Sequence, residues 1–564
     1  MYLRVTKRRN QDGSVVAYYQ LAETRWDPEK RRPAAHIIHN FGRADALDRE
    51  ALLRLARSIS RVGQEGIEIP MEVAPPGEAI EIEWARPLGV VHVARVLWEE
   101  LGIGEILRGL ERRQGRRAPH ELALFTMVAN RLAEPCSKLA CHEHWVPERV
   151  YCPEAAGLTQ EQLYFALDFL DTHIEAVERE VFFRMADLFR ADVDLIFWDT
   201  TSVYFEVDDE DEAPETRRGT TLPPLRKRGH NKEGRDGNPQ VVVGLALTRD
   251  GLPVRSWVFP GNTVDATTVA QVKESLRGWK LNRAIFVGDA GMDSEANRRE
   301  LAKGLGHYIL AMPMGKLTEV QAQVLSRAGR FRPVTDSLEV KEVVVGEGER
   351  RRRYIVCRNL QEAQRQRRHR EEILTALRQE LARLDPEAPA HAKRACELVA
   401  SRRYGRYLTR GPGGRLAIDP AGITRAERMD GKFVLLTNDD TLTPEDVGQG
   451  YKAMMIIEAC FRRMKTTGLR IRPVYHWTAH RIVSHVKLCV LALLLERAAE
   501  IRTGESWRNL RLTLEEIKAV RYRVHGTTIV QSTRLTAQAT AVLKKRGISP
   551  PKRILAVEHA PLPS

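Results

Sequence analysis

The spacing of apolar residues changes several times along the chain, and each change predicts a different kind of structure. Near the N-terminus, apolar and polar positions alternate in three short stretches, YLRVTKRR, SVVAYYQLAE and AAHIIHNFG, which is typical of β-strands. The segment 1–46 is therefore predicted to form a small basic β unit. A helical pattern then runs from Asp48 through Arg61.

Helical spacing dominates the region 47–190, as in VVHVARVLWEELGIGEIL and ELALFTMVANRLA. The basic run ERRQGRR at 111–117 interrupts this pattern. Such a run is either a solvated face or a contact with a polyanion, and the sequence leaves both interpretations open. The region is predicted to be mostly helical, with one positive edge.

Near Asp192 the period changes to that of β-strands. Across 191–315 the pattern predicts the order β-β-β-α-β, in the segments DLIFWDTTSVYFEV, NPQVVVGLALT, LPVRSWVFPG, TTVAQVKESLRGW and RAIFVGDAGM. The segment 316–430 breaks the pattern with a β segment, an Arg-rich helix and further short strands, and is predicted to be an insertion. Residues 431–500 return to a strand and long helices, and 501–564 are mixed and basic.

Charge narrows the classes of partner. The chain has 564 residues, with 89 Lys and Arg against 75 Asp and Glu, and its net charge of +14 favours a polyanion such as nucleic acid. The longest apolar run, Leu488 to Leu495, is far short of the roughly 20 residues of a membrane-spanning helix. The N-terminus lacks the apolar stretch of a signal peptide, so we expect a cytoplasmic protein. The basic run makes region 47–190 the candidate DNA-binding region.

Cysteine does not supply the chemistry. Seven cysteines without regular spacing indicate a reducing compartment rather than a disulfide framework. One cluster contains the residue types of zinc ligands, but it has no paired C-x-x-C element. It comprises Cys136, Cys141, His142, His144 and Cys152. Buried apolar cysteines are the alternative interpretation of this cluster.

Two acids follow apolar strand sequences in the same way. Asp199 follows LIFW and Asp289 follows IFVG. Carboxylates at the ends of neighbouring strands, which lie about 4.8 Å apart, can share metal ions. Oxygen-only ligands favour Mg²⁺ or Mn²⁺, and two such ions are expected. Either Asp alone is also typical of a turn or a helix cap.

Glu458 is the candidate third carboxylate. If 451–465 forms one α-helix at about 100° per residue, Tyr451, Glu458, Arg462 and Lys465 lie within an arc of roughly 60°. The acid can then complete a metal site, while the cations hold phosphates of the same strand. The alternative is a solvated helix face with a Glu-to-Arg pair.

These residues resemble a known family. Tyr451, Glu458 and Lys465 match the Y-(2)-R-(3)-E-(6)-K signature of the cut-and-paste DDE transposases of the IS-four superfamily. Further blocks are similar to its IS-sixteen-thirty-four branch, and the resemblance runs over most of the chain. These blocks are WDTTSVYFE, GHNKEGRDGNPQVVVG, FPGNT, VGDAGM, DGKFVLLTN and IRPVYHWTAHRIVSHV.

The resemblance implies an α/β fold in which a ribonuclease H-like catalytic core is interrupted by a mixed α/β insertion. A small β unit and a helical DNA-binding domain would precede this core. It implies a metal-dependent enzyme that cleaves transposon ends and transfers the strand to target DNA. The catalytic carboxylates and metal ligands would be Asp199, Asp289 and Glu458.

The same resemblance implies partners and DNA contacts. The expected partners are double-stranded terminal inverted repeats and target DNA, bound by a homodimer. The expected DNA contacts are Tyr451, Arg462, Lys465 and Arg472. Two alternatives stay open, namely a DDE-type nuclease that does not join strands and a catalytically silent DNA-binding protein derived from a transposase.

The sequence departs from the family pattern at two points. Met454 stands at the Arg position of the signature, so that phosphate contact is lost or moved, and Arg462 is one candidate to replace it. No Trp lies between 280 and 476, where an insertion Trp would hold a flipped base. Tyr404, Tyr407 and Trp477 are candidates for that role.

Overall fold

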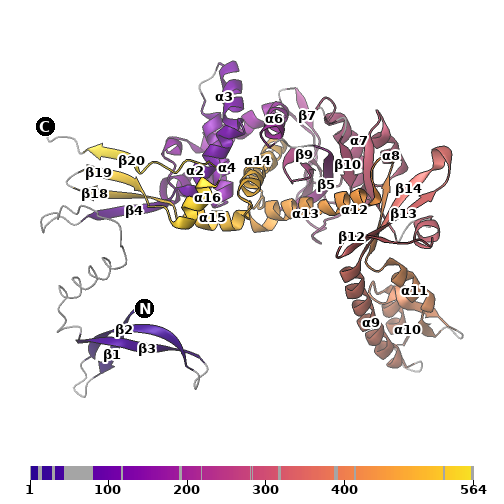
Figure 1. Ribbon diagram of the computed structural model, residues 1–564. Coiled ribbons are helices and arrows are strands. Elements are labelled where there is room, and N and C mark those ends of the chain that lie inside the picture. The colour runs from indigo at the N-terminus through magenta and orange to yellow at the C-terminus, as the bar shows by residue number, and fades with distance from the viewer. Residues whose placement is uncertain are drawn as a thin grey trace. The chain divides into compact units, whose positions relative to one another are not determined.

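The chain forms two units, Met1–Ala79 and Ile80–Ser564, in the computed structural model (Figure 1). The structure describes residues 2–9, 15–27, 32–43, 80–115, 118–189, 193–217, 219–279, 281, 284–314, 319–385, 391–411, 415–524, 527–545 and 547–559. The helix predicted from Asp48 to Arg61 lies outside the described residues.

The N-terminal unit contains the predicted three-stranded sheet. Its strands are β1 (Tyr2–Arg9), β2 (Val15–Asp27) and β3 (Arg32–Arg43). They are antiparallel and follow one another in chain order. The β2 side chain of Ala22 is buried, whereas Trp26 is 64% exposed.

A nine-stranded mixed sheet forms the centre of the second unit, in the order β12-β13-β14-β17-β11-β10-β5-β8-β9. β10 is parallel to both β5 and β11, and the other neighbouring pairs are antiparallel. The strands are β5 (Leu195–Tyr204), β8 (Gln240–Thr248), β9 (Pro253–Pro260), β10 (Ile285–Gly288), β11 (His307–Met312), β12 (Arg332–Thr335), β13 (Leu338–Val345), β14 (Arg352–Asn359) and β17 (Lys432–Thr437).

The predicted β-β-β-α-β order is confirmed by β5, β8, β9, the helix α7 (Asp265–Ser275) and β10. A short hairpin that the pattern did not predict, β6 (Glu215–Arg217) and β7 (Thr220–Leu222), lies between β5 and β8. All nine residues of β8 are buried between β5 and β9, and helices contact the sheet on these two strands, α6 and α14 on β9 and α13 on β5.

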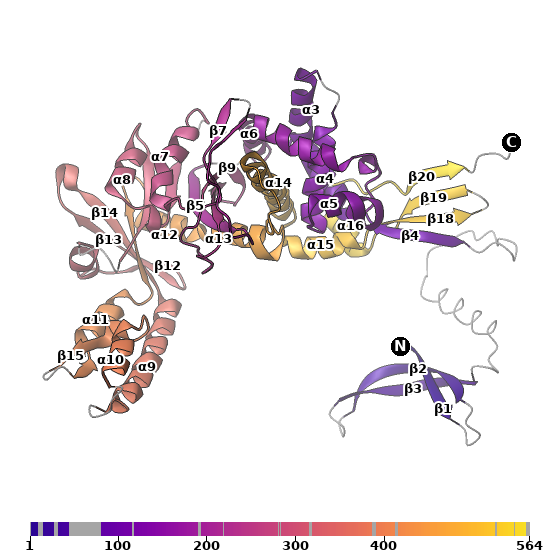
Figure 2. The ribbon, with the colours of Figure 1, turned by 180° about the vertical axis from the view of Figure 1, so that it is seen from behind.

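The segment between β11 and β17 contributes to two structures. Its strands β12, β13 and β14 form one edge of the nine-stranded sheet and join it through the pairing of β14 with β17. Its helices α9 (Leu360–Ala382), α10 (His391–Ala400) and α11 (Pro420–Met429) form a helical cluster with a core of its own (Figure 2). That core contains Ile373, Leu374, Leu377 and Tyr407.

Helices distant in the sequence pack together beside the sheet. The long apolar helix α14 (Ala479–Thr503) contacts α4 (His120–Ala133), α6 (Gln160–Leu188) and strand β9 (Figures 1 and 2). The predicted helical region and the segment after Glu458 therefore share one hydrophobic core. Cys141 and Cys152 are buried in that core, as the alternative to zinc ligation expected.

The C-terminal segment forms a second sheet that the sequence pattern did not define. Its order is β20-β19-β18-β4, and β4 (Glu81–Pro87) precedes the first helices of this unit. The other strands are β18 (Lys518–Val524), β19 (Thr527–Ser532) and β20 (Ile554–His559). The remaining elements include α2 (Gly89–Glu100), α3 (Ile103–Arg113), α5 (Lys138–Ala140), α8 (Glu295–Ala302), β15 (Leu408–Arg410), β16 (Leu416–Ile418), α15 (Trp507–Glu515) and α16 (Ala537–Lys544).

The segment 451–465 is not the one regular α-helix that the sequence analysis assumed. α12 (Pro444–Ala453) ends before a turn at Met454, α13 (Met455–Arg462) follows, and a π-helix, η8, covers Arg463–Thr467. Both changes alter the angle between successive side chains, since a π-helix has more residues per turn than an α-helix.

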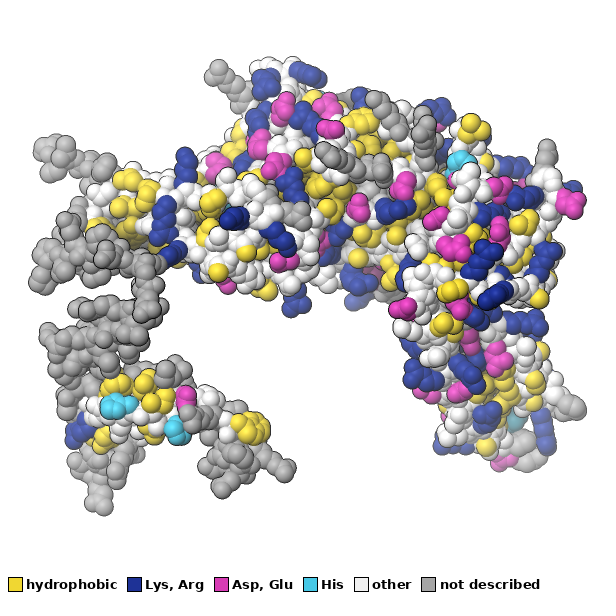
Figure 3. All heavy atoms as spheres, viewed as in Figure 1, with side chains coloured by type: hydrophobic (Ala, Val, Ile, Leu, Met, Phe, Trp, Pro, Cys, Tyr) yellow, Lys and Arg dark blue, Asp and Glu magenta, His cyan; other side chains and the backbone are white. Residues whose placement is uncertain are grey.

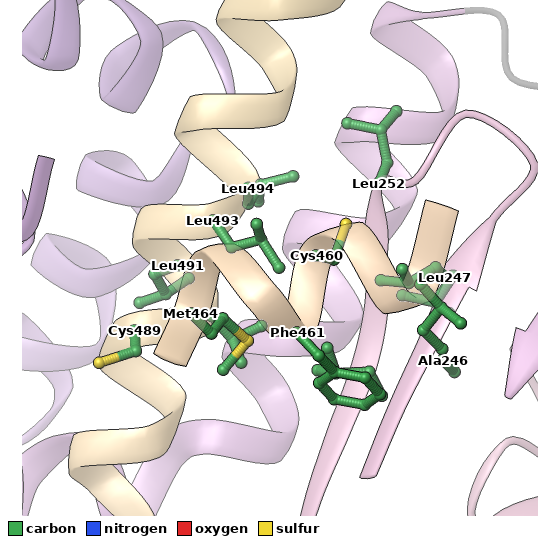
Figure 4. Packing of buried hydrophobic residues seen from close by; sticks show 14 of the residues in the cluster. Ala246, Leu247, Leu252, Cys460, Phe461, Met464, Cys489, Leu491, Leu493 and Leu494 are labelled. Carbon is green, nitrogen blue, oxygen red and sulfur yellow. The ribbon is translucent and has the colours of Figure 1, made fainter. Parts of the chain in front are cut away.

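Apolar packing holds α13 and η8 in place. Cys460, Phe461 and Met464 point towards the β8–β9 hairpin and α14 (Figure 4). Their labelled neighbours are Ala246, Leu247 and Leu252 on the hairpin side and Cys489, Leu491, Leu493 and Leu494 on α14. Glu458 on the same helix is exposed. Among the helices that the structure describes, none is both long enough and apolar enough to span a membrane.

Gly244 allows the core beside Asp199 to close. A Cβ atom at Gly244 on β8 would lie 2.2 Å from the buried Trp198 ring, which packs edge-on against Trp257 with 5.0 Å between ring centroids. Replacing Gly244 with Ala should therefore lower the free energy of unfolding by about 1–3 kcal/mol, because the ring must shift within a close-packed core. Urea denaturation measures this change.

Gly157→Ala is the matched control, because nothing lies within 4 Å of a Cβ atom at Gly157. The two variants should differ clearly in their urea midpoints. Equal midpoints would contradict the close approach of Gly244 to Trp198.

Candidate active site

Asp199 and Asp289 leave two parallel, neighbouring strands at the same level. The paired residues of β5 and β10 end at Trp198 and Gly288, so each Asp is the next residue of its chain. The sequence pattern suggested that Asp199 ends its strand. It does not, because β5 continues to Tyr204 through its pairing with β8. It lies where the pairing of β5 with β10 ends.

Local hydrogen bonds orient both carboxylates. Oδ1 of Asp199 accepts a hydrogen bond of 2.7 Å from the backbone N–H of Thr200. Oδ1 of Asp289 accepts one of 2.6 Å from the N–H of Ala290, where Asp289 caps the short 3₁₀-helix Ala290–Met292. Asp199 is half-buried and Asp289 is exposed.

Glu458 reaches the same cavity from α13. A cavity of about 220 Å³ is lined by Asp199, Asp289, Glu458 and Tyr451. Leu338 at the start of β13 and Asn359 at the end of β14 also line it, so the strands of the predicted insertion form part of its wall. The structure thus brings the three predicted carboxylates to one cavity.

The carboxylates do not form a closed ligand shell. Within the described ranges, no group of three or more His, Cys, Asp or Glu side chains is arranged so that it could hold a metal ion. Binding an ion here requires the side chains to close around it.

Burial and like charge disfavour a carboxylate anion at Asp199. Burial raises its pKa to about 6, and the nearby carboxylates of Asp289 and Asp265 add to this increase. Lys232 and the N–H of Thr200 oppose it. The pKa of Tyr451 is raised too, by burial first and then by the surrounding acids, so its phenol stays neutral. A cation in this cavity would be electrostatically favoured.

Two residues of the site were missed by the sequence analysis. Asp265 begins α7, and Lys232 lies in the loop before β8. The ammonium of Lys232 is 3.2 Å from Asp265 Oδ2 and 3.6 Å from Asp199 Oδ1. An acid in the first turn of a helix is commonly explained by the helix dipole, so Asp265 does not stand out in the sequence as a site residue.

The predicted DNA-contacting cations lie in different surroundings. Arg462 is exposed and forms no ion pair with any residue that the structure describes. Lys465 Nζ is 2.6 Å from Glu233 Oε1, and Arg472 Nη2 is 3.0 Å from Glu233 Oε2. On the face seen in Figure 3, basic side chains are spread over several elements and interspersed with acidic ones.

The three aromatic candidates for base stacking differ in exposure. Tyr407 is 2% exposed and Tyr404 packs beside the same small core. Trp477 is 63% exposed, with the guanidinium of Arg226 4.7 Å from its ring centroid. Of these three aromatic side chains, Trp477 is the most exposed. Met454, at the signature position of Arg, is buried and lines the cavity.

Comparison with known proteins identifies two matching families. Residues 213–495 match the family described as "Transposase DDE domain", and residues 3–72 match "IS1634 family transposase, N-terminal domain". The first match includes Asp265, Asp289 and Glu458 and begins after Asp199. No curated protein matches the chain.

Two solved structures are similar over part or most of the chain. A piggyBac transposase synaptic complex with hairpin DNA has 9% identity and a TM-score of 0.33, over 82% of each chain. A Mos1 transposase paired-end complex with the left transposon end has 13% identity and a TM-score of 0.13, over 45% of this chain and 66% of that one.

The raised pKa of Asp199 predicts a pH-dependent effect on stability. A carboxyl whose pKa rises from 3.8 in the unfolded chain to about 6 when folded favours folding below pH 4, and this contribution is lost as the pH rises through 6. In metal-free protein, Asp199→Asn should therefore become more stable than wild type as the pH rises, by roughly 1–3 kcal/mol at pH 7.

Thermal melts of the two proteins in EDTA, recorded between pH 5 and pH 7.5, measure this difference. The gap should widen with pH and level off above about pH 7. A gap that is constant over this range would show that Asp199 does not titrate as described.

Proposed function

The chain belongs to the Transposase DDE domain family, and from that premise we propose that Asp199, Asp289 and Glu458 are the catalytic carboxylates of this DNA transposase. The observation that carries the proposal is the single cavity that all three side chains line. The reaction is cleavage at transposon ends, followed by transfer of the freed strand to target DNA.

The strand arrangement supports a ribonuclease H-like catalytic core. The order β9-β8-β5-β10-β11 combines an antiparallel hairpin with parallel strands β5, β10 and β11. Asp199 lies on the first of these strands in the chain, Asp289 follows the fourth, and Glu458 lies on a later helix. This placement supports the ribonuclease H-like core that the family resemblance implies.

The donor set suits a hard divalent cation, on which enzymes of this family depend. We propose that two Mg²⁺ or Mn²⁺ ions are held by Asp199, Asp289 and Glu458. When bound, such ions supply positive charge at the reacting phosphate. Asp199 would bind such an ion as a carboxylate, without its proton. Asp289 and Glu458 would turn towards the ion. Tyr451 would stay neutral, so it would add no negative charge to the cavity.

Arg462 is the proposed DNA contact with the most accessible cation. It ends α13 one helical turn after Glu458, and its guanidinium is free of ion pairs among the described residues. A phosphate bound there would lie near the acidic cavity. Arg462 thereby takes over the phosphate contact that Met454 cannot make.

Two related functions are separated from this one by assay. A nuclease of the same chemistry would cleave end DNA without producing joined products. A catalytically silent relative would bind DNA and do neither. Incubation with DNA that carries candidate end sequences, Mg²⁺ and a target plasmid distinguishes the three outcomes.

Removal of any one carboxylate should abolish cleavage while the protein stays folded. We expect Asp199→Ala, Asp289→Ala and Glu458→Ala each to reduce the rate at which 3′-hydroxyl ends form by at least about a hundredfold, because loss of even an outer-shell partner of a metal ligand costs 10–100-fold. Gel analysis of labelled end DNA measures the rate.

Asp209→Ala is the control, since Asp209 is an exposed acid outside the cavity. It should cleave like wild type. A folded Glu458→Ala protein that cleaves at the wild-type rate would overturn the assignment.

Arg462→Ala should weaken DNA binding to a similar extent for all sequences. Loss of one phosphate contact lowers the slope of log K against log salt by about one. Fluorescence anisotropy at several salt concentrations gives the slope. Arg299→Ala is the control, because Arg299 is 77% exposed but lies on α8 and pairs with Glu295. If both variants change the slope equally, Arg462 is not a specific contact.

A further inference from the structure

A short turn places two opposite charges at the two halves of the proposed site. Residues 231–238, called the 231–238 turn below, lie directly before β8. Asn231 is buried, and its side-chain N–H donates to Gln240 Oε1 at 2.7 Å. Its side-chain oxygen accepts from the N–H of Glu233, and its own N–H donates to Asp236 Oδ1, both at 2.7 Å. The turn is thereby anchored to the central sheet.

Lys232 places an ammonium among the acids. Its Nζ donates to the backbone oxygen of Thr200 at 2.8 Å, in addition to its ion pairs with Asp199 and Asp265. The ammonium therefore partly neutralises the negative charge of Asp199 and Asp265.

Glu233 places a carboxylate among the cations. One oxygen accepts from Lys465 and the other pairs with Arg472, two of the four residues expected to contact DNA. Two further guanidinium nitrogens of Arg472, Nε and Nη1, are buried without a hydrogen-bond partner among the described residues. Glu233 therefore satisfies only part of the hydrogen-bonding capacity of Arg472.

These contacts are partly open to water. The side chains of Lys232 and Glu233 are 39% and 30% exposed, whereas the anchoring Asn231 is buried. Their partners are less exposed, at 16% for Asp199, 9% for Lys465 and 16% for Arg472, so water reaches each ion pair mainly from the side of the turn. The two charged side chains can therefore leave their partners while the turn stays attached through Asn231.

We propose that the 231–238 turn occupies the active site of the DNA-free protein as an internal substitute for its ligands. Lys232 stands in for a divalent cation, and Glu233 stands in for a DNA phosphate. Metal and DNA then bind by displacing these two side chains, so the turn inhibits the empty enzyme. This inference rests on the proposed function, because it takes the acids as metal ligands and Lys465 and Arg472 as phosphate contacts.

The metal half is tested with Mn²⁺ alone. Calorimetric titration of the full chain without DNA should give a dissociation constant lower by about five- to a hundredfold for Lys232→Met, since a unit charge within 4 Å of the acids is removed. Lys452→Met is the matched control, because Lys452 lines the same cavity but forms no ion pair with a described residue. An unchanged or weaker Mn²⁺ affinity, or an equal gain in Lys452→Met, would overturn this half.

The DNA half is tested with a duplex oligonucleotide and no metal. Glu233→Gln should bind more tightly and steepen the salt slope by about two, one for each cation that it frees. Glu206→Gln is the matched control, because exposed Glu206 lines a cavity with Arg472 but has no ion-pair partner in the described chain. Weaker binding by Glu233→Gln would show that Glu233 supports Lys465 and Arg472 instead of blocking them.

Displacement is also measurable in the wild-type protein, which removes any dependence on how the variants fold. Labelling of the Lys232 ammonium by an amine-acylating reagent, followed by peptide mapping, should speed up when Mn²⁺ is added, because its ion pairs with Asp199 and Asp265 are then broken. Slower or unchanged labelling of Lys232 contradicts displacement. Wild-type protein that binds neither Mn²⁺ nor DNA would contradict the proposed function itself, whereas normal wild-type binding with unresponsive variants contradicts only this inference.

Discussion

Carboxylates gathered around a small cavity repel one another, and the other parts of this site have to hold them together against that repulsion. It is visible at Asp199, where burial and the neighbouring acids raise the pKa to about 6. Such a cluster does not assemble through its own interactions, so other parts of the fold must hold it. The same repulsion makes the cavity selective for cations, which is the property that phosphoryl transfer on DNA requires.

Apolar packing supplies the force that holds the acids. The buried strands β5 and β10 hold Asp199 and Asp289 in position. The helix α13 carries Glu458 to the cavity, and the opposite face of this helix is buried against the β8–β9 hairpin and α14 (Figure 4). Burial of large apolar side chains contributes about 1.5–3 kcal/mol each, so several of them together outweigh the repulsion between the acids. The three carboxylates are thus carried by elements that apolar packing holds in place.

Charge compensation within the chain follows from the same arrangement. Lys232 and Glu233 are adjacent in sequence, yet the side chain of Lys232 pairs with acids and that of Glu233 pairs with cations. A free enzyme that must later bind both a divalent cation and a polyanion has unsatisfied charge of both signs. One anchored turn can neutralise both at once, and the partial exposure of its side chains keeps that neutralisation reversible.

The sequence by itself predicted the β-β-β-α-β order, the three-stranded N-terminal sheet and Asp199, Asp289 and Glu458 as candidate carboxylates, because apolar periodicity and short motifs are local properties. It did not predict the turn at Met454 or the π-helix at Arg463–Thr467. Nor did it determine the pairing of β4 with β18, or the contacts of Lys232 and Asp265 with Asp199. These contacts join residues that are far apart in the chain. They form only when burial of the hydrophobic core compensates for the entropy lost on closing the long loops between them.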